Sequence, residues 1–343
     1  MTKRILAFTG VAFVAGVLLS SDLPSRAIHG QALQNPDRPN ARFQMTTLNG
    51  DSRAYVVVFD PSSGECWVQD TTFQGWRYLG SPVANQPSKP KPTPDRGFEG
   101  TNAGDRKELV PTPTIAFRWC PAGTFTMGED DKKVEVALTS GYWLGETEIT
   151  QGQWQKLMGT SPWSGQEHVK EGADHAASYI SHDDAVSYCQ KLTAQERCAG
   201  RLPKGWKYRL PTESQWEYAC RAGTQTTFSF GVSESPLGEY GWFDQNAADG
   251  GEIFAHPVGK KKPNVWGLLD MHGNVGEWCS DWWDSKLAGG RDPAGASSGA
   301  GRVHRGGAWT SLAVNCRSAY RLDSSPDFRS YDLGFRLSAV PSE

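Results

Sequence analysis

The sequence predicts an α+β protein whose main domain is irregular and rich in loops. Capping motifs predict a few short helices. After about residue 225, long loops of Gly, Asp, Ser and Pro separate short strands rich in tryptophan. No β-α-β alternation is visible, which argues against a parallel, doubly wound sheet. The 343 residues include 14 Trp and 38 Gly, a composition typical of an irregular backbone held in place by large rings.

Three short helices are predicted from their N-terminal capping boxes. In this motif an N-cap hydroxyl accepts a hydrogen bond from a free backbone N–H, and the side chain three residues later bonds back. Apolar residues follow each motif, and Gly159 and Gly223 mark two of the helix ends. The paired capping residues are Thr150 with Gln153, Ser181 with Asp184, and Thr212 with Gln215.

The first 27 residues have the pattern of a signal peptide. Lys3 and Arg4 precede an uncharged apolar run over residues 5–19, and small and polar residues follow at 20–27. The run is short for a membrane span, so we expect an exported protein, periplasmic or secreted. A membrane anchor formed by an uncleaved signal is the alternative.

The rest of the chain divides into a small unit, a linker and a large domain. Strand patterns at 54–59, 66–68 and 76–79 predict a small β unit. A proline-rich stretch interleaved with Lys and Asp follows, which favours an extended linker. The predicted division is signal peptide 1–27, small β unit 42–82, linker 83–112 and main domain 113–343.

Charge and cysteine usage exclude several classes of partner and site. The formal net charge is −3, so no broad positive field attracts nucleic acid, and no membrane contact is expected beyond the signal segment. The 7 cysteines are an odd number, so at least one is free, intermolecular or metal-bound. None lies in a CxxC pair, which leaves a zinc or thioredoxin-type site without support.

A series of ordered blocks carries a resemblance to a known family. The blocks are FRWCPAGTFTMG at 117–128, ETEITQGQW at 146–154, YRLPTESQWEYACR at 208–221, HGNVGEW at 272–278, RGGAW at 305–309 and LGFR at 333–336. Together they resemble the sulfatase-modifying factor, or formylglycine-generating enzyme, superfamily. The resemblance implies an irregular relative of the C-type lectin fold, found in oxidases, iron-dependent sulfoxide synthases and display proteins. Fold alone therefore does not fix the function.

The resemblance implies an oxidase site that this chain does not complete. In the family, two thiolates in a C-x4-C arrangement after the GG(S/A)W block hold the Cu(I) ion that oxidises a substrate cysteine. Counting forward from the glycine pair places Ser311 and Cys316 at the two cysteine positions. Counting back from LGFR places Cys316 near a structural cysteine, and we favour this count because it needs no gap. Either way one thiol remains, so copper is not expected and no catalytic residue is assigned.

For Cys316 the resemblance implies a structural role. In the family the corresponding cysteine pairs with one on the third helix, which here is Cys220. Such a disulfide ties that helix to the C-terminal strands and contributes about 2–4 kcal/mol. A free, reactive Cys316 is the alternative.

The HGNVGEW block matches a structural calcium loop of the family. The resemblance implies that Ca²⁺ is held by the carboxylates of Asp270 and Glu277 and the carbonyls of Gly273 and Val275, all hard oxygen donors. The alternative is a tight turn in which Asn274 caps its own backbone.

The same resemblance suggests a ligand groove lined by Trp309, Ser311 and Arg317, where the enzymes seat their peptide. Arg321 and Arg336 are interpreted as structural groups that pair with buried carboxylates and stack on tryptophans. The missing thiol favours an exported binding or accessory module for a peptide, protein or glycan. The alternatives are an oxidoreductase with an altered copper or iron site and a lectin-like display protein.

Overall fold

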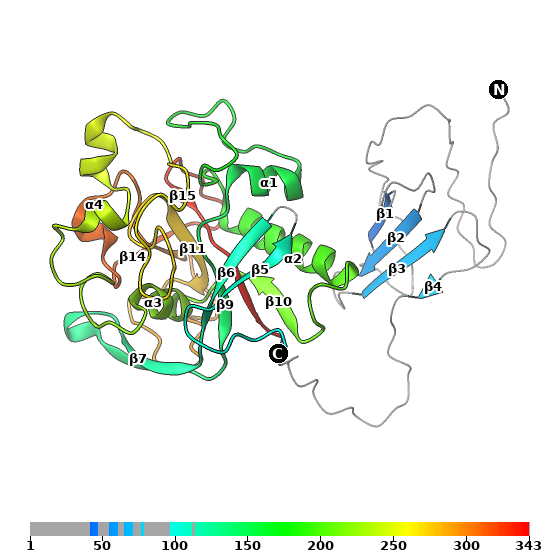
Figure 1. Cartoon of the computed structure of the whole chain (residues 1–343), viewed down its shortest axis with the longest axis horizontal. Helices are drawn as coiled ribbons and strands as arrows, with labels where there is room; N and C mark the ends of the chain where they lie inside the picture. The colour runs from blue at the N-terminus through cyan, green and yellow to red at the C-terminus, as the bar shows by residue number, and fades with distance from the viewer. Residues whose placement is uncertain are drawn as a thin grey trace. The chain divides into compact units, whose positions relative to one another are not determined.

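The computed structural model describes residues 97–111 and 114–342 with their side chains, and four strands within residues 42–78 by their backbone. The chain divides into two units, Met1–Ser88 and Lys89–Glu343 (Figure 1). The predicted signal peptide, 1–27, lies outside the described residues.

The first unit contains an antiparallel sheet in the order β1-β2-β3-β4. The strand patterns predicted at 54–59, 66–68 and 76–79 correspond to β2, β3 and β4, and β1 adds a strand that the sequence pattern did not suggest. The bounds are β1 (Arg42–Thr46), β2 (Tyr55–Asp60), β3 (Glu65–Asp70) and β4 (Arg77–Tyr78).

In the large unit the three predicted helices form, and each begins at its capping box. The hydroxyls of Thr150, Ser181 and Thr212 each accept a hydrogen bond from the third helical N–H, and the side chain there bonds back. The first helix ends at Gly159 in the left-handed region, as predicted, and the third ends at Ala222, one residue before the predicted glycine. The helices are α1 (Gln151–Met158), α2 (His182–Cys198) and α3 (Glu213–Arg221).

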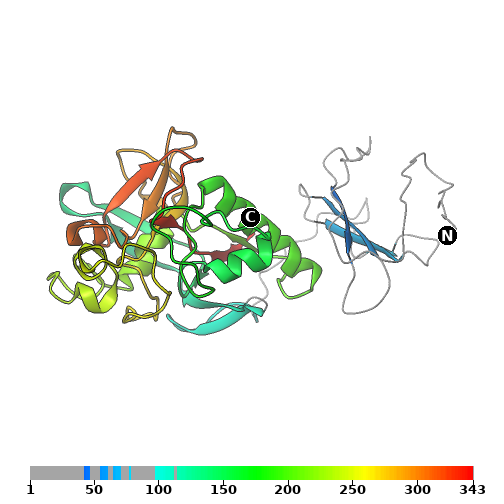
Figure 2. The same ribbon diagram turned by 90° about the horizontal axis from the view of Figure 1, so that it is seen from above.

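A five-stranded sheet forms the centre of the large unit, in the order β10-β16-β9-β6-β5. The last strand of the chain, β16, lies between β10 and β9 and is antiparallel to both, so C-terminal residues complete the sheet. Helices α1 and α2 lie side by side, and α2 runs along β10 (Figures 1 and 2). The strands are β5 (Arg106–Pro111), β6 (Thr114–Cys120), β9 (Tyr142–Gly145), β10 (Trp206–Arg209) and β16 (Ser338–Pro341).

Both faces of this sheet are buried, because successive residues of a strand point to opposite faces. Trp143 of β9 packs with α1 and α2 in one core, whereas its neighbours Tyr142 and Leu144 pack with α3 in a second core. In β16, Ala339 and Val340 divide between the two cores in the same way. The sheet therefore separates two hydrophobic cores.

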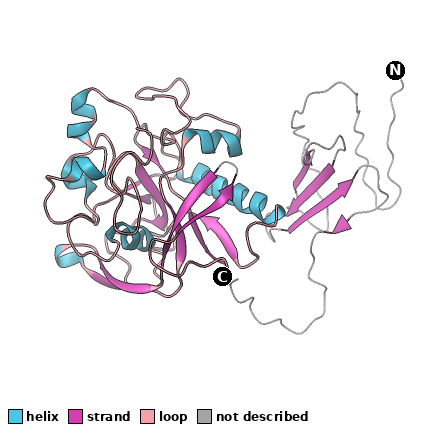
Figure 3. Cartoon of the chain, in the orientation of Figure 1, coloured by secondary structure: helices cyan, strands magenta, loops and turns pink. Residues whose placement is uncertain are grey.

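Short strands and long loops make up the rest of the large unit (Figure 3). A four-stranded sheet has the order β14-β13-β11-β15, and a three-stranded sheet the order β12-β8-β7. The sheet strands are β7 (Gly123–Met127), β8 (Val134–Leu138), β11 (Gly276–Trp282), β12 (Gly290–Arg291), β13 (Arg302–Arg305), β14 (Arg321–Ser324) and β15 (Leu333–Gly334). The short helical turns are η1 (Asp130–Lys132), α4 (Leu237–Tyr240), η2 (Asp244–Asn246), η3 (Ala248–Gly250) and η4 (Ala313–Cys316).

The predicted linker, 83–112, ends earlier than expected. β5 lies inside it and pairs with β6, with Leu109 and Val110 buried in the core. Phe98 is also buried there, and its carbonyl accepts a 2.8 Å hydrogen bond from the Trp143 indole N–H. The large unit therefore includes residues 97–111, because their apolar side chains cover an edge of its core. In the described part of the chain, no helix is both long and apolar enough to span a membrane.

A buried ion pair joins the sheets of the large unit. The guanidinium of Arg336 donates to both carboxylate oxygens of Glu277 at 2.6 Å, and neither side chain is exposed. Trp216 of α3 donates to the same carboxylate at 2.6 Å. Arg336 also donates to the carbonyls of Gly145 and Leu269, both at 2.9 Å. The structural role predicted for Arg336 is therefore confirmed as pairing with a buried carboxylate.

Replacing Arg336 is expected to destabilise the fold strongly. Arg336→Met leaves Glu277 buried without its counter-charge, and such a loss typically costs about 3–5 kcal/mol. We expect a large fall in the urea midpoint at constant slope. Arg106→Met is the control, since Arg106 is an ion-paired but half-exposed residue and should change stability by less than about 1 kcal/mol. Equal effects of the two substitutions would contradict the central role of the buried pair.

Candidate functional site

The site segment begins with a turn whose backbone conformation favours glycine. Gly306 and Gly307 have φ angles of 99° and 71°, in the left-handed region. A Cβ on Gly307 would also lie 2.6 Å from the Sγ of Cys316. The glycine pair therefore lets η4, which carries Cys316, fold back against the end of β13.

Polar contacts hold the rest of the segment. Ser311 Oγ accepts a 3.0 Å hydrogen bond from the Ala308 N–H, which closes a tight turn. Thr310 donates its hydroxyl to Asp332 at 2.8 Å, and the Trp309 N–H donates to the Asn274 carbonyl at 2.9 Å. The segment is thus attached both to the predicted calcium loop (the HGNVGEW block, 272–278) and to the residue before β15.

A small cavity of about 70 Å³ opens beside this segment. Of the predicted groove residues, Ser311 lines it. Trp309 does not: its side chain is 2% exposed and packs in a core cluster with Val275. Arg317 is held by Glu129 through two hydrogen bonds of 2.7 and 3.1 Å. The residues that line the cavity are Gly276, His304, Arg305, Gly307, Ala308, Ser311, Tyr320, Leu322, Phe328, Asp332 and Leu333.

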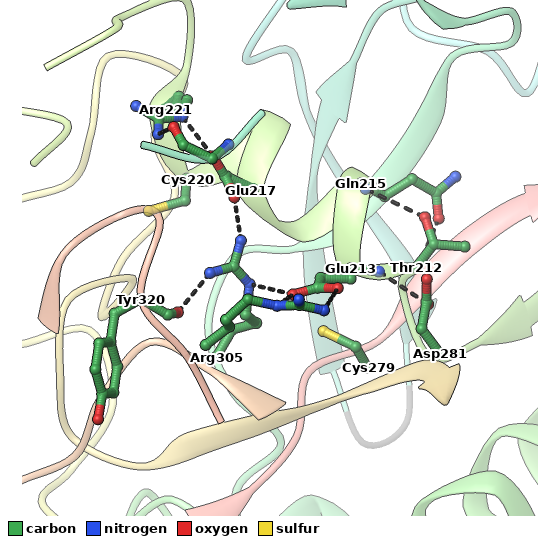
Figure 4. Close-up of polar contacts among 12 residues, drawn as sticks. Thr212, Glu213, Gln215, Glu217, Cys220, Arg221, Cys279, Asp281, Arg305 and Tyr320 are labelled. Carbon is green, nitrogen blue, oxygen red and sulfur yellow. Dashed lines mark hydrogen bonds and ion pairs between the residues drawn. The ribbon is translucent and has the colours of Figure 1, made fainter. Parts of the chain in front are cut away.

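Buried ion pairs neutralise Arg305, the cation in this lining (Figure 4). Its guanidinium contacts Glu217, and its Nε lies 3.4 Å from Glu213. Glu217 also pairs with Arg221 at 2.8 Å, and Glu213 with Arg321 at 2.6 Å, so positive and negative charges alternate. Arg305 therefore gives the cavity little net positive charge.

Ser311, His304 and Asp332 all line the cavity but do not form a catalytic triad. The Ser311 hydroxyl accepts from Ala308, and Nε2 of His304 lies 3.2 Å from the hydroxyl of Ser324. Burial lowers the pKa of His304 to about 4, so the ring is neutral at neutral pH. Activating a serine requires a hydrogen bond from serine to histidine, and this arrangement does not provide one.

The expected disulfide between Cys220 and Cys316 is not present, since both are free, buried thiols. The His272 ring links the two segments instead. Its Nε2 lies 3.8 Å from Cys220 Sγ, and its Nδ1–H donates to the Cys316 carbonyl at 2.8 Å. Ser229 approaches Nε2 at 2.8 Å, and burial lowers the pKa of His272 to about 4. A neutral imidazole thus connects α3 and η4 where a covalent bond was expected.

The residues present do not fit a two-sulfur copper site. The segment 306–317 contains one cysteine, and burial raises the pKa of the Cys316 thiol to about 12. A protonated thiol is a poor ligand for Cu(I), which binds thiolates. At the other predicted position stands Ser311, whose hydroxyl serves the local turn.

The two carboxylates of the predicted calcium set, Asp270 and Glu277, have different partners in the structure. Glu277 is occupied by Arg336 and Trp216. Asp270 is 1% exposed, its Oδ2 accepts a 2.6 Å hydrogen bond from the Gly259 N–H, and its Oδ1 has no partner in the described part of the chain.

Glu148 is the carboxylate that the sequence did not suggest. Its Oε1 accepts a 3.0 Å hydrogen bond from Asn274, and its Oε2 also lacks a partner among the described residues. Burial, followed by the neighbouring charge of Asp270, raises the pKa of Glu148 well above its usual value, and burial raises the pKa of Asp270 to about 6. Two such oxygens fit a hard cation or a proton. No group of three or more His, Cys, Asp or Glu side chains in the described residues is arranged to hold a metal, so a cation here would also need backbone carbonyls.

With this fold and site in view, comparison with known proteins places the chain in a family. The family model of the sulfatase-modifying factor enzyme 1-like domain matches residues 106–339 of this sequence. The chain belongs to this family, and the resemblance inferred from the sequence blocks is confirmed.

Relatives and solved structures agree with this assignment. The chain is 28% identical to the formylglycine-generating enzyme of Mus musculus over 287 residues, which is 64% of this chain and 73% of that protein. It is 35% identical to the Streptomyces coelicolor formylglycine-generating enzyme over 179 residues, or 48% of this chain and 52% of that one. The solved Treponema denticola variable protein 1 is 31% identical with a TM-score of 0.59, covering 66% of this chain and 96% of its own. PvdO from Pseudomonas aeruginosa, at 24% identity and a TM-score of 0.61 over 70% and 99% of the two chains, shares the fold. The predicted loop-rich α+β fold is therefore confirmed.

Two carboxylates of the site were missed from the sequence, Glu148 and Asp332. Glu148 lies in the ETEITQGQW block just before α1, where it looks like part of a solvated turn. Asp332 immediately precedes the LGFR block. The available signal was a carboxylate next to buried apolar residues, Ile149 in one case and Leu333 in the other.

Thiol labelling tests the state of Cys220 and Cys316. Burial raises the pKa of each thiol to about 12, so the thiolate fraction at pH 8 is on the order of 10⁻⁴. We expect neither cysteine to react with iodoacetamide at pH 8 in the folded protein. Both should be alkylated after unfolding without reductant, as read by peptide mass mapping. A cross-linked pair of peptides in the unreduced digest would show that the disulfide is present and would contradict the free thiols.

Proposed function

We propose that this protein is an exported binding or accessory module of the family, without formylglycine-generating oxidase activity. The observation that carries the proposal is the state of the site segment. It contains the single thiol of Cys316, which is buried, protonated at neutral pH and packed against Gly307. Export is proposed from the signal-like residues 1–27.

The local geometry supports binding rather than thiol chemistry. The hydroxyl of Ser311 is engaged by the backbone N–H of Ala308, and Arg317 by Glu129. What remains open is the small cavity, whose lining combines apolar side chains with one carboxylate, Asp332. Such a surface suits recognition of a peptide, protein or glycan, because it offers shape and charge without a reactive group.

A direct assay separates the two functions. Purified protein is incubated with Cu(I), a reductant, oxygen and a Cys-x-Pro-x-Arg peptide, and the peptide mass is followed. We expect an unchanged peptide, because one protonated thiol does not make a two-thiolate site. An authentic enzyme run in parallel shows that the conditions support turnover. A loss of mass that matches conversion of the thiol to an aldehyde would overturn the proposal.

We further propose a structural Ca²⁺ between Asp270 and Glu148. The unpartnered Asp270 Oδ1 and Glu148 Oε2 are the side-chain ligands that fit it, together with the carbonyls of Gly273 and Val275. This set differs from the one predicted from the sequence in that Glu148 takes the place of Glu277. When bound, the ion would compensate two buried carboxylates and stabilise the loop that carries Asn274 and contacts Trp309.

Removal of calcium tests this site. We expect EGTA to lower the thermal midpoint, and added Ca²⁺ to restore it, because an ion that binds only the folded state stabilises it by about 2.7 kcal/mol at one hundred times its Kd. Asp270→Asn and Glu148→Gln should remove the calcium response, whereas Asp249→Asn, an exposed carboxylate, should keep it. An identical midpoint with EGTA and with Ca²⁺ would contradict the site.

A further inference from the structure

A second cavity opens on the other side of β14 from the cavity of the site segment. Arg321 lines the second cavity, whereas the next residue of the strand, Leu322, lines the first. Successive residues of a strand point to opposite faces, so the two cavities lie on different faces of the sheet that contains β14. They share no lining residue, and the volume of the second cavity is about 210 Å³.

Small residues form much of the wall of the second cavity. Ala288, Gly295 and Ala296 come from the loops on either side of β12 and bring no large side chain into the hollow. The backbone of Ala296 is bridged to that of Trp282, which fixes this loop beside the indole. Gly295 has a φ angle of 71°, and a Cβ there would lie 2.9 Å from the Cβ of Asp281. The hollow is therefore a feature of the loop backbone, and a larger side chain at Ala288 or Ala296 would fill it.

Trp282 gives the second cavity an aromatic wall. The guanidinium carbon of Arg302 lies 3.5 Å from the centre of the indole and covers one of its faces. Arg302 does not line the cavity, so the cavity meets a part of the ring that Arg302 leaves uncovered. In the described part of the chain no group accepts a hydrogen bond from the Trp282 indole N–H. Trp282 therefore offers both an apolar surface and an unused donor.

The charged groups in the lining of the second cavity cancel. Two hydrogen bonds of 2.6 Å join Arg321 to Glu213, and both side chains are largely buried, so this pair neutralises itself. Asp284 and Lys286 are exposed, and neither has an ion-pair partner among the described residues. The cavity is thus left with one free carboxylate, one free ammonium group and no net charge.

From this arrangement we propose that the second cavity binds a neutral sugar ring. The apolar C–H face of the ring lies against Trp282 and Leu287, which both line the cavity. Its hydroxyls, which donate and accept hydrogen bonds, reach the carboxylate of Asp284 and the ammonium of Lys286. The inference goes beyond the proposed function and does not depend on it, because the site lies on the other face of β14 from the segment 306–317.

The size of the cavity and the exposure of its charges favour a sugar ring over other ligands without net charge. Pockets that enclose whole drug-sized molecules measure roughly 300–1,000 Å³, so about 210 Å³ suits a single ring. A zwitterion, such as a free amino acid, would depend on ion pairs with Asp284 and Lys286. Exposed ion pairs contribute little to binding, because water screens them.

Saturation-transfer difference NMR on the full chain tests the proposal, because it detects weak binding without a label. The probes are methyl β-D-glucopyranoside, methyl β-D-galactopyranoside and methyl α-D-mannopyranoside. L-Leucine, a zwitterion, and glycerol, an open-chain polyol, are measured at the same concentration. We expect saturation of the ring C–H protons of at least one glycoside, and none of leucine or glycerol. The affinity should not change with salt, because the ligand carries no charge.

Variants connect binding to the second cavity. Ala288→Leu and Ala296→Leu fill the hollow, so each is expected to weaken binding by more than about tenfold. Lys286→Met removes one exposed hydrogen-bonding group and should weaken binding about threefold to tenfold. The matched controls are Ala294→Leu, an exposed alanine of the same loop as Ala296, and Lys204→Met, an exposed lysine. Neither residue lines the cavity, so both variants should bind like the parent protein. Circular dichroism checks that each variant is folded.

The free monosaccharides identify the source of the sugar. Equal affinities of a methyl glycoside and its free sugar support recognition of a residue within a glycan. Tighter binding of the free sugar supports a monosaccharide ligand. Either result supports a site for a sugar ring.

Other outcomes would overturn the inference. These are the absence of saturation on all three glycosides, binding of leucine as tight as that of a glycoside, and affinities untouched by Ala296→Leu and Lys286→Met. Copper-dependent turnover of a cysteine peptide would overturn the proposed function and leave the sugar site standing. That turnover is read by peptide mass, so the two failures are distinguishable.

Discussion

The large unit depends on the fully buried ion pair between Arg336 and Glu277. This guanidinium and carboxylate connect the strand β11, the segment between β15 and β16, and the indole of Trp216 on α3. Arg336 also reaches two loop carbonyls, so segments far apart in the sequence meet at one point. Because a buried charge is costly without its partner, the pair strongly favours one arrangement of these segments over alternatives. A loop-rich chain with short helices needs such fixed points, since its backbone forms few long ladders of its own.

The same principle governs the chemistry of the site. Arg305 lies at the cavity, yet Glu217 and Glu213 take up its charge, so it positions β13 and the Tyr320 carbonyl rather than offering a cation to a ligand. His272 is neutral and joins α3 to η4 through the Cys316 carbonyl. Burial keeps Cys316 protonated. The side chains with the greatest chemical reactivity thus hold the scaffold together. The exposed groups at the cavity are apolar or acidic.

This division explains how a family scaffold can remain intact around a segment, 306–317, that contains a single cysteine. The blocks that match the sulfatase-modifying factor enzyme 1-like domain include the residues of the buried pairs, Glu217, Glu277, Arg305 and Arg336. Retaining them preserves the fold whether or not the surface segment 306–317 carries two thiols. The surface is then free to present a different set of side chains, and at the cavity of this chain these include Leu322, Phe328 and Asp332.

The sequence by itself determined the features that depend on neighbours in the chain. The capping boxes at Thr150, Ser181 and Thr212 set the helix starts, because an N-cap satisfies backbone groups only a few residues away. The ordered blocks determined the family. Other features were decided by tertiary structure alone, because they join residues far apart in the chain. Glu148 meets the predicted calcium loop, Glu129 takes up Arg317, and His272 stands where a Cys220–Cys316 disulfide was expected. Which charges are compensated, and so which remain free to bind, depends on these long-range contacts, and no local pattern in the sequence reports them.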